Sequence, residues 1–242
     1  MLQSTERPDA QGVVTFDVAA QGLRALNQAL HALRDKPTNE TVWEVVNTRG
    51  AHAIAAGVDA PLDITVHGTT GYYCAGMNKQ ATIRIKGNAG PGTAENMMSG
   101  TVIVEGDASQ YAGATGRGGL LVIKGNASSR CGISMKGIDI VVHGSIGHMS
   151  AFMAQSGNLV VLGDAGEALG DSLYEARLFL RGSVKSLGAD CVEKEMRPEH
   201  LALLEDLIRR GLAEGKAEPS EFRRYGSARR LYTFHVDNAS SY

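Results

Sequence analysis

The sequence lacks most of the features that point directly to a class of function. Its three cysteines, Cys74, Cys131 and Cys191, are an odd set without CxxC spacing, so neither a disulfide framework nor a zinc or iron–sulfur site is suggested. No stretch approaches the roughly 18 consecutive apolar residues of a transmembrane helix, and the first residues lack the order of a secretion signal. We therefore expect a soluble cytoplasmic protein with three reduced, partly buried thiols.

The chain also lacks an excess of one charge and has few aromatic side chains. With 24 lysines and arginines against 26 aspartates and glutamates in 242 residues, neither nucleic acid nor an anionic membrane surface is the expected partner. Only 5% of the residues are aromatic, whereas 30 residues are glycine. A core with so few aromatics has to be built from many small, regular layers, and a sequence repeat is the way to build them.

A repeat of 19 residues runs through the middle of the chain. A short apolar run such as IRIKG or VIVEG ends in a glycine seven times in succession, at Gly68, Gly87, Gly106, Gly125, Gly144, Gly163 and Gly182. The first and third residues of each run are Ile, Val or Leu, and this alternation is typical of a strand with one buried face. Two inward columns of aliphatic side chains follow, from Ile64 and Val66 to Leu178 and Leu180.

The other repeat positions predict the shape of each turn. The fourth residue of each run is mostly charged or titratable and should face water, with His67 and His143 among these positions. The glycine and the small polar residue after it predict a corner, at which glycine takes a backbone angle that other residues cannot. Only alanine or glycine stands seven residues beyond each glycine, which indicates a thin part of the coil or a close approach of backbone.

These columns predict an all-β-dominated fold, a parallel, right-handed β-solenoid whose turns, or rungs, have 19 residues each. A single repeat cannot bury its apolar side, but stacked copies form a continuous core. We assign residues 46–196 to the solenoid, with an irregular first rung, and residues 1–45 to an N-terminal strand and helix cap. Residues 197–242 should form a helix and an extended tail that wraps the solenoid or a neighbour. Leucines at helical spacing in both flanks predict that helices cover the two ends of the coil.

No constellation of residues for catalysis, cofactor binding or metal binding stands out, and none is assigned to this chain. The glycine-rich segment GATGRGG at 113–119 lacks the lysine–serine pair and the strand-to-helix context of a phosphate loop, and its glycines fit the repeat. His67, His143 and His148 show no ligand-like cluster for zinc.

The second half of the rungs departs from strict repetition and concentrates methionines and basic side chains. Methionine is an adaptable contact residue, and basic groups stacked rung upon rung form a stripe. The candidate subunit interface consists of Met77, Asn78, Lys79, Arg117 and Lys136. The plainer interpretation is that the methionines fill gaps beside the small column and that the stripe is merely solvated.

The succession IKGNAGPGTAENMMSGTVIVEGDASQYAGATGRGGLLVIKGN resembles the GXGXG solenoid that forms the C-terminal domain of the large subunit of glutamate synthase. The phrases GYYCAGMNKQAT and EFRRYGSARRLY are similar in particular to the small glutamate-synthase-like subunit of N-methylglutamate synthase, the methylamine–glutamate N-methyltransferase. The resemblance covers about residues 15 to 242.

The resemblance implies a division of labour among three subunits. In that family an amidotransferase-like subunit and an FMN-binding glutamate-synthase-like subunit carry the catalytic parts, so FMN is expected in a partner. This chain begins Met-Leu, has no cysteine before Cys74 and matches only the third part, a non-catalytic structural GXGXG subunit. The complex would make N-methylglutamate from methylamine and glutamate with release of ammonia. The alternative is the solenoid subunit of a formylmethanofuran dehydrogenase-like or formyltransferase/hydrolase complex.

Overall fold

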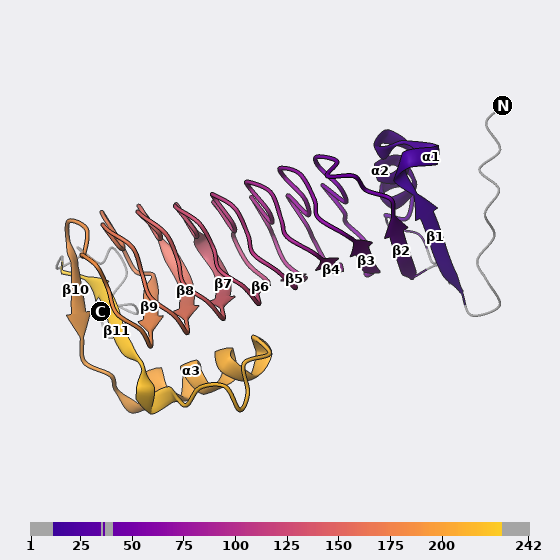
Figure 1. Ribbon diagram of the computed structural model, residues 1–242. Coiled ribbons are helices and arrows are strands. Elements are labelled where there is room, and N and C mark those ends of the chain that lie inside the picture. Colours follow the sequence, from indigo (N-terminus) through magenta and orange to yellow (C-terminus); the bar gives the residue numbers. More distant parts are fainter. Residues whose placement is uncertain (1–11, 35, 37–40, 229–242) are drawn as a thin grey trace.

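One long sheet coils through the protein in the computed structural model, which describes residues 12–34, 36 and 41–228 (Figure 1). Strands β1 to β9 pair in parallel and in chain order, and β11 then pairs antiparallel with both β9 and β10. The fold class predicted from the repeat is confirmed. The strands are β1 (Val13–Asp17), β2 (Val42–Val46), β3 (Asp63–His67), β4 (Thr82–Lys86), β5 (Thr101–Val104), β6 (Leu120–Ile123), β7 (Lys136–Val142), β8 (Ser156–Val161), β9 (Arg177–Leu180), β10 (Cys191–Lys194) and β11 (Arg223–Ser227).

The two inward columns form the core as predicted, and they extend further than the repeat indicates. The two columns hold fourteen aliphatic side chains, from Ile64 and Val66 to Leu178 and Leu180, and each of them is at most 1% exposed. Trp43 pairs in register with Ile64, and Val14 pairs with Trp43, so β2 and β1 continue the same stack. The 19-residue spacing misses them because Trp43 precedes Ile64 by 21 residues, and a helix-containing segment separates β1 from β2.

The repeat predicts that the recurring glycines take a backbone angle that other residues cannot. The structure shows that most of them are required by close packing instead. Only Gly68 among the seven has a positive φ, of 103°. At Gly144 an added Cβ would lie 2.4 Å from Asn126 Oδ1 and 2.8 Å from the carbonyl oxygen of Gly125. Five of the seven glycines therefore leave room for both a polar side chain and the backbone of the rung before them: Gly106, Gly125, Gly144, Gly163 and Gly182.

A ladder of side-chain hydrogen bonds runs along these corners. The backbone N–H of Asn126 donates to Asp107 Oδ1 at 2.7 Å, and that of Ser145 donates to Asn126 Oδ1 at 2.9 Å. The same pattern joins Asp164 to Ser145 and Ser183 to Asp164. Each small polar residue thus satisfies a backbone group of the next rung, in addition to the glycine-to-glycine backbone bonds, as between Gly144 N and Gly125 O at 2.9 Å.

The small-residue column lies in the second half of the rungs, where the backbone repeatedly takes left-handed angles. Ala75, Ala94 and Ala151 are buried there with φ of 56° each. At Gly113 an added Cβ would lie 2.6 Å from Ile140 Cδ1, so the column faces the inward strand residues at close range. The prediction of a thin coil is therefore confirmed for these rungs.

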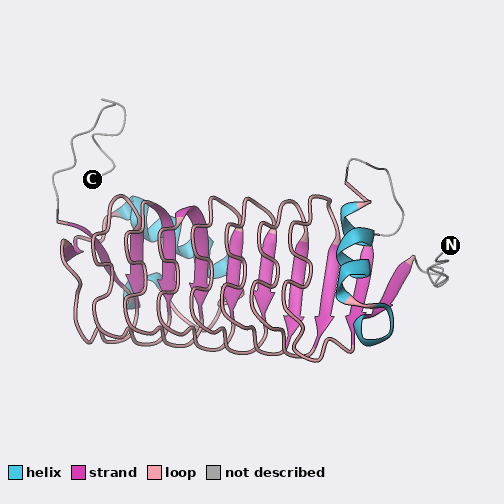
Figure 2. Cartoon of the chain, turned by 90° about the horizontal axis from the view of Figure 1, so that it is seen from above, coloured by secondary structure: helices cyan, strands magenta, loops and turns pink. Residues whose placement is uncertain are grey.

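The C-terminal helix α3 (Pro198–Arg210) packs along the outer face of the sheet and does not cap the end of the coil (Figures 1 and 2). The middle, outward positions of the strands are Thr65 and Arg84 early in the coil, but become apolar from Ile103 onward. A second core forms between this strip and α3; its residues include Ile103, Val122, Val141, Val160, Phe179, Leu204, Leu207 and Ile208.

The fourth column is therefore only partly open to water. Leu162 is 4% exposed within the second core, and His143 is half-buried where its Nε2 lies 2.8 Å from the carbonyl oxygen of Gly211, at the C-terminus of α3. The expectation that His143 is solvated is wrong for this reason. His67 is more exposed and pairs with Glu44 on the outer face of the sheet.

The two ends of the coil are closed by different means. The N-terminal end carries α1 (Val18–Gln21) and α2 (Leu23–His31), and the latter inserts Leu26 and Leu30 fully into the main core. At the other end β10 and β11 finish the sheet, and β11 follows the short helix η1 (Pro219–Glu221). The predicted tail is a strand up to Ser227, and residues 229–242 lie outside the described residues.

Residue 45, at which we expect the solenoid to take over from the cap, lies inside β2, and the three predicted domain ranges stay predictions. Among the described residues no helix has both the length and the apolar character needed to cross a bilayer.

Candidate functional site

A groove opens at the edge of the coil where α2 meets the second half of the first rungs. Its volume is about 760 Å³, and it is lined by His31, Arg34, Gly57, Asp59, Met77, Lys79, Asn96, Met98 and Arg117. The structure thus brings together three of the five predicted interface residues, Met77, Lys79 and Arg117. Lys79, Met98 and Arg117 stand 19 residues apart in sequence and therefore stack on consecutive rungs.

The end of α2 forms one wall of this groove and lies close against the coil. His31 Nε2 lies 2.7 Å from the carbonyl oxygen of Ala56. An added Cβ on Gly57 would lie 3.3 Å from the same imidazole nitrogen, so a larger residue would press against the helix end. Arg34, which follows α2, then reaches Asp59 at 3.2 Å.

Cations outnumber the single carboxylate of the groove. Asp59 accepts hydrogen bonds from Gln80 at 2.9 Å and from Lys79 at 3.0 Å, and these bonds hold the pKa of its carboxyl below the usual value. Two of the three cations, Lys79 and Arg34, share this one carboxylate. In the described part of the chain no carboxylate pairs with Arg117, so the groove keeps a positive charge.

The floor of the groove is apolar and accessible. The side chains of Met77 and Met98 are 46% and 40% exposed, which is unusual for residues that normally fill cores. Exposed methionine beside cations gives a surface able to contact both the apolar and the charged parts of a partner.

Asn78 differs from the other predicted interface residues because it is fully buried. Its Nδ2 donates to the carbonyl oxygen of Ala81 at 2.8 Å and to that of Ser99 at 3.3 Å. Asn78 therefore ties its rung to the next one and supports the groove without forming its surface.

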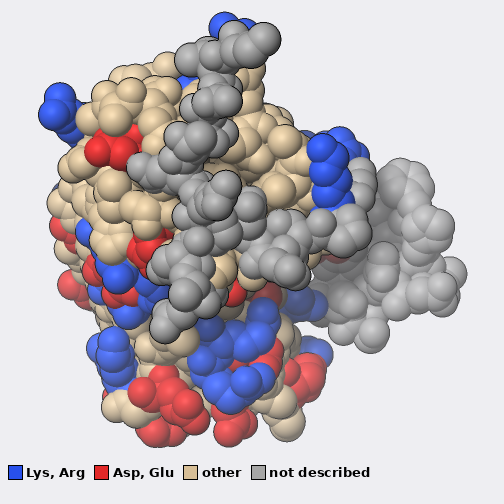
Figure 3. All heavy atoms as spheres, turned by 90° about the vertical axis from the view of Figure 1, so that its right-hand side faces the viewer, with Lys and Arg blue, Asp and Glu red and all other residues tan. Residues whose placement is uncertain are grey.

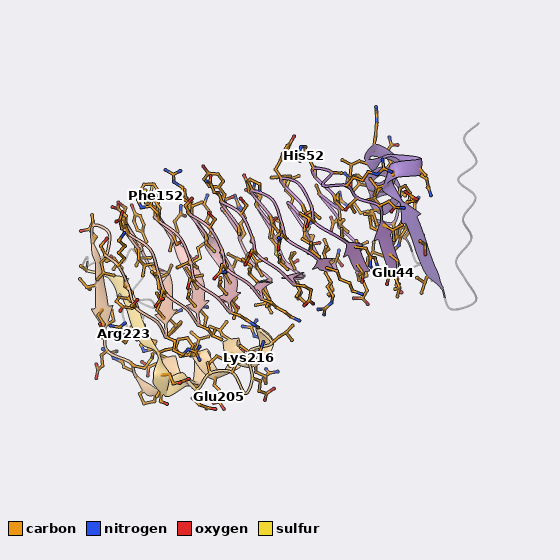
Figure 4. All side chains as sticks on the ribbon, viewed as in Figure 1. Glu44, His52, Phe152, Glu205, Lys216 and Arg223 are labelled. Atoms are coloured by element: carbon orange, nitrogen blue, oxygen red, sulfur yellow. The ribbon has the colours of Figure 1, made fainter. Side chains whose placement is uncertain are left out.

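Lys136 lies one rung beyond Arg117 on the same edge, is exposed and does not line the groove. A second groove of about 520 Å³ follows on this edge, lined by Met153, Gln155, Ser156, Tyr174 and Glu175. The edge therefore changes from basic near α2 to neutral and acidic near the C-terminal end. Figure 4 shows Phe152 and His52 on this side of the coil, away from Glu205 and Lys216 on the α3 side.

Sequence reasoning missed Arg34, which follows α2 and belongs to no repeat column, and it also missed Asp59. Asp59 did leave a signal, because it occupies the position one rung before Lys79, with which it forms an isolated bridge. At the N-terminal end seen in Figure 3, basic and acidic side chains are interspersed, so the visible surface carries no field of one sign.

The described residues offer little reactive chemistry. Burial raises the pKa of the Cys74, Cys131 and Cys191 thiols to about 12, so these free cysteines stay protonated at neutral pH. Across residues 12–34, 36 and 41–228 no three His, Cys, Asp or Glu side chains gather as metal ligands. The glycines of GATGRGG lie in the turn half of a rung, where the repeat places them.

Comparison with known proteins identifies the family of the chain. No family model matches the chain. It is 66% identical over 227 residues to Protein GlxC of Rhizobium meliloti (strain 1021), and the match covers 94% of this chain and 99% of that protein. Because the identity is this high over almost the full length of both proteins, the two share one fold and one set of repeats. The chain therefore belongs to the family of Protein GlxC.

Proposed function

We propose that this chain is the non-catalytic structural subunit of a glutamate-synthase-like complex, and that the complex makes N-methylglutamate from methylamine and glutamate with release of ammonia. The sequence resemblance to GXGXG subunits supports this proposal. Its partners are then an amidotransferase-like subunit and an FMN-binding subunit, which carry the catalytic parts. The role of this chain is to bind both and to hold their sites in register.

The observation that carries the docking part of the proposal is the basic, methionine-floored groove at the coil edge. Rungs are about 4.8 Å apart, so Arg117 and Lys136 are like charges on adjacent rungs of a rigid scaffold. Neither has a carboxylate partner among the described residues, and an acidic surface of a partner subunit would relieve their repulsion. Met77 and Met98 would then be covered by apolar side chains of the same partner.

Assembly of the complex tests the proposal directly. The chain is co-expressed with the amidotransferase-like and FMN-binding subunits and applied to size-exclusion chromatography, with flavin absorbance as the marker. We expect co-elution of all three chains with bound flavin, and N-methylglutamate formation by the complex alone. Turnover by the isolated chain, or isolation from the native host with a formylmethanofuran dehydrogenase-like or formyltransferase/hydrolase complex, would contradict it.

The docking surface is tested by reversing its unpaired charges. The double variant Arg117→Glu/Lys136→Glu should weaken assembly at least tenfold, whereas Lys86→Glu, an equally exposed reversal on the sheet face, should leave it unchanged. Lys79 is left intact because a glutamate there would face Asp59 and destabilise the rung itself. Equal behaviour of the two variants would rule out this edge as the docking surface.

A further inference from the structure

A cluster of cations at the C-terminal end of the sheet is not used by the docking edge. Arg224 on β11 pairs in register with Phe179 on β9 and with Lys194 on β10. Arg177 stands two residues before Phe179 on the same strand and therefore on the same outer face of the sheet. Arg197, the residue that caps the N-terminus of α3, adds a third guanidinium beside these two.

The three guanidinium groups are close enough to affect one another. Burial, and then the charges of Arg197 and Arg177, lower the pKa of Arg224. Arg224 donates from Nε to the carbonyl oxygen of Glu195 at 3.0 Å, and Arg197 donates from Nε to the Glu195 carboxylate at 3.4 Å. That carboxylate is 76% exposed, so it screens the cluster only weakly. The Arg177 guanidinium forms no hydrogen bond or ion pair with another described residue.

A buried imidazole lies near the same cluster and has an unused donor. His200 is 9% exposed, and its Nδ1 accepts the backbone N–H of Arg197 at 3.2 Å, which places the proton on Nε2. Among the described residues no acceptor bonds that Nε2. Burial, followed by the charge of Arg224, lowers the pKa of His200; Arg177 and Arg197 act in the same direction, and Glu199 opposes them.

We propose that Arg177, Arg197, Arg224 and His200 form a binding site for an oxyanion group, a phosphate or a carboxylate. Guanidinium forks match the planar or tetrahedral arrangement of such oxygens and bind them with two parallel N–H donors. The aligned peptide dipoles at the N-terminus of α3 favour the same charge. Counting Lys194 with the three arginines, four cations stand against Glu195 and Glu199, so one bound anion offsets a local excess of positive charge.

Inorganic phosphate serves as the probe on the full chain, with the His200 imidazole followed by NMR. Phosphate should raise the pKa of His200 and the thermal midpoint, with saturation at a defined concentration. Arg177→Gln should weaken phosphate binding at least tenfold without loss of fold, because no side-chain hydrogen bond or ion pair joins Arg177 to another described residue. Arg209→Gln, on an exposed arginine of α3 that pairs with Asp206, should bind phosphate like the unaltered protein.

The source of the anion is decided in the assembled complex. Phosphate binding that persists with partner subunits present assigns the site to a free small molecule. Loss of phosphate binding on assembly, together with weaker assembly of Arg177→Gln, assigns it to an acidic side chain of a partner. An unchanged pKa of His200 on adding phosphate, or equal binding by Arg177→Gln and Arg209→Gln, overturns the proposal.

Discussion

The corner glycines give the sharpest test of how this coil is held together, and Gly144 is the best position for it. In Gly144→Ala the new Cβ would lie 2.4 Å from Asn126 Oδ1 and 2.8 Å from the carbonyl oxygen of Gly125. Two hydrogen bonds are at stake, from Ser145 N to Asn126 Oδ1 and from Gly144 N to Gly125 O, both 2.9 Å long.

The magnitude follows from these two contributions. Each lost hydrogen bond costs about 1 kcal/mol. Forcing the methyl group into the stacked backbone adds about 1–3 kcal/mol. The expected loss in the free energy of unfolding is therefore about 3–5 kcal/mol, which for a chain of this length lowers the thermal midpoint by about 10 °C.

Three further variants separate close packing from backbone angle. Gly215→Ala places a methyl group where no atom lies within 4 Å, at a φ of 73°, so it should cost only about 1 kcal/mol from the left-handed angle. Asn126→Ala removes the nearest clashing oxygen, so the double variant Asn126→Ala/Gly144→Ala should lose less than the sum of its parts. Thermal unfolding followed by circular dichroism measures all four proteins. If Gly144→Ala were as mild as Gly215→Ala, the close-packing explanation would be refuted.

Three other predictions follow from the second core, the half-buried histidine and the thiols. Phe179→Ala should cost about 3–5 kcal/mol and speed proteolysis within α3, whereas the half-buried Phe152→Ala should do less; limited proteolysis and chemical unfolding measure both. Burial lowers the pKa of His143, so the stability that depends on its neutral form is complete above the unfolded-state pKa of about 6.5 and is lost as the pH falls below that value. The free energy of unfolding should therefore differ less between pH 7.5 and pH 5.5 in His143→Gln than in the unaltered protein. Cys74 and Cys131 should not react with a thiol reagent at pH 8 until the chain unfolds, and rapid labelling of the native protein would contradict their burial.

The sequence determined the architecture because the repeat acts through neighbours. The inward columns and the polar corner residues recur at 19 residues, and their members pair with the same repeat position one rung away. Contacts of this kind can be predicted from spacing alone. The same 19-residue spacing predicts that Lys79 and Arg117 lie together at one edge, and the structure confirms this position. Their role in a subunit interface stays a prediction.

The tertiary structure decided everything that involves segments outside the repeat. Only the folded chain shows that His31 of α2 and the following Arg34 line the groove and that Asn78 is buried. It also moves α3 from the end of the coil to the outer face, a position that the change from Arg84 to Ile103 in the outward column does encode. Such long-range contacts carry no fixed spacing, since a helix can bury its apolar face against any exposed apolar strip of suitable length.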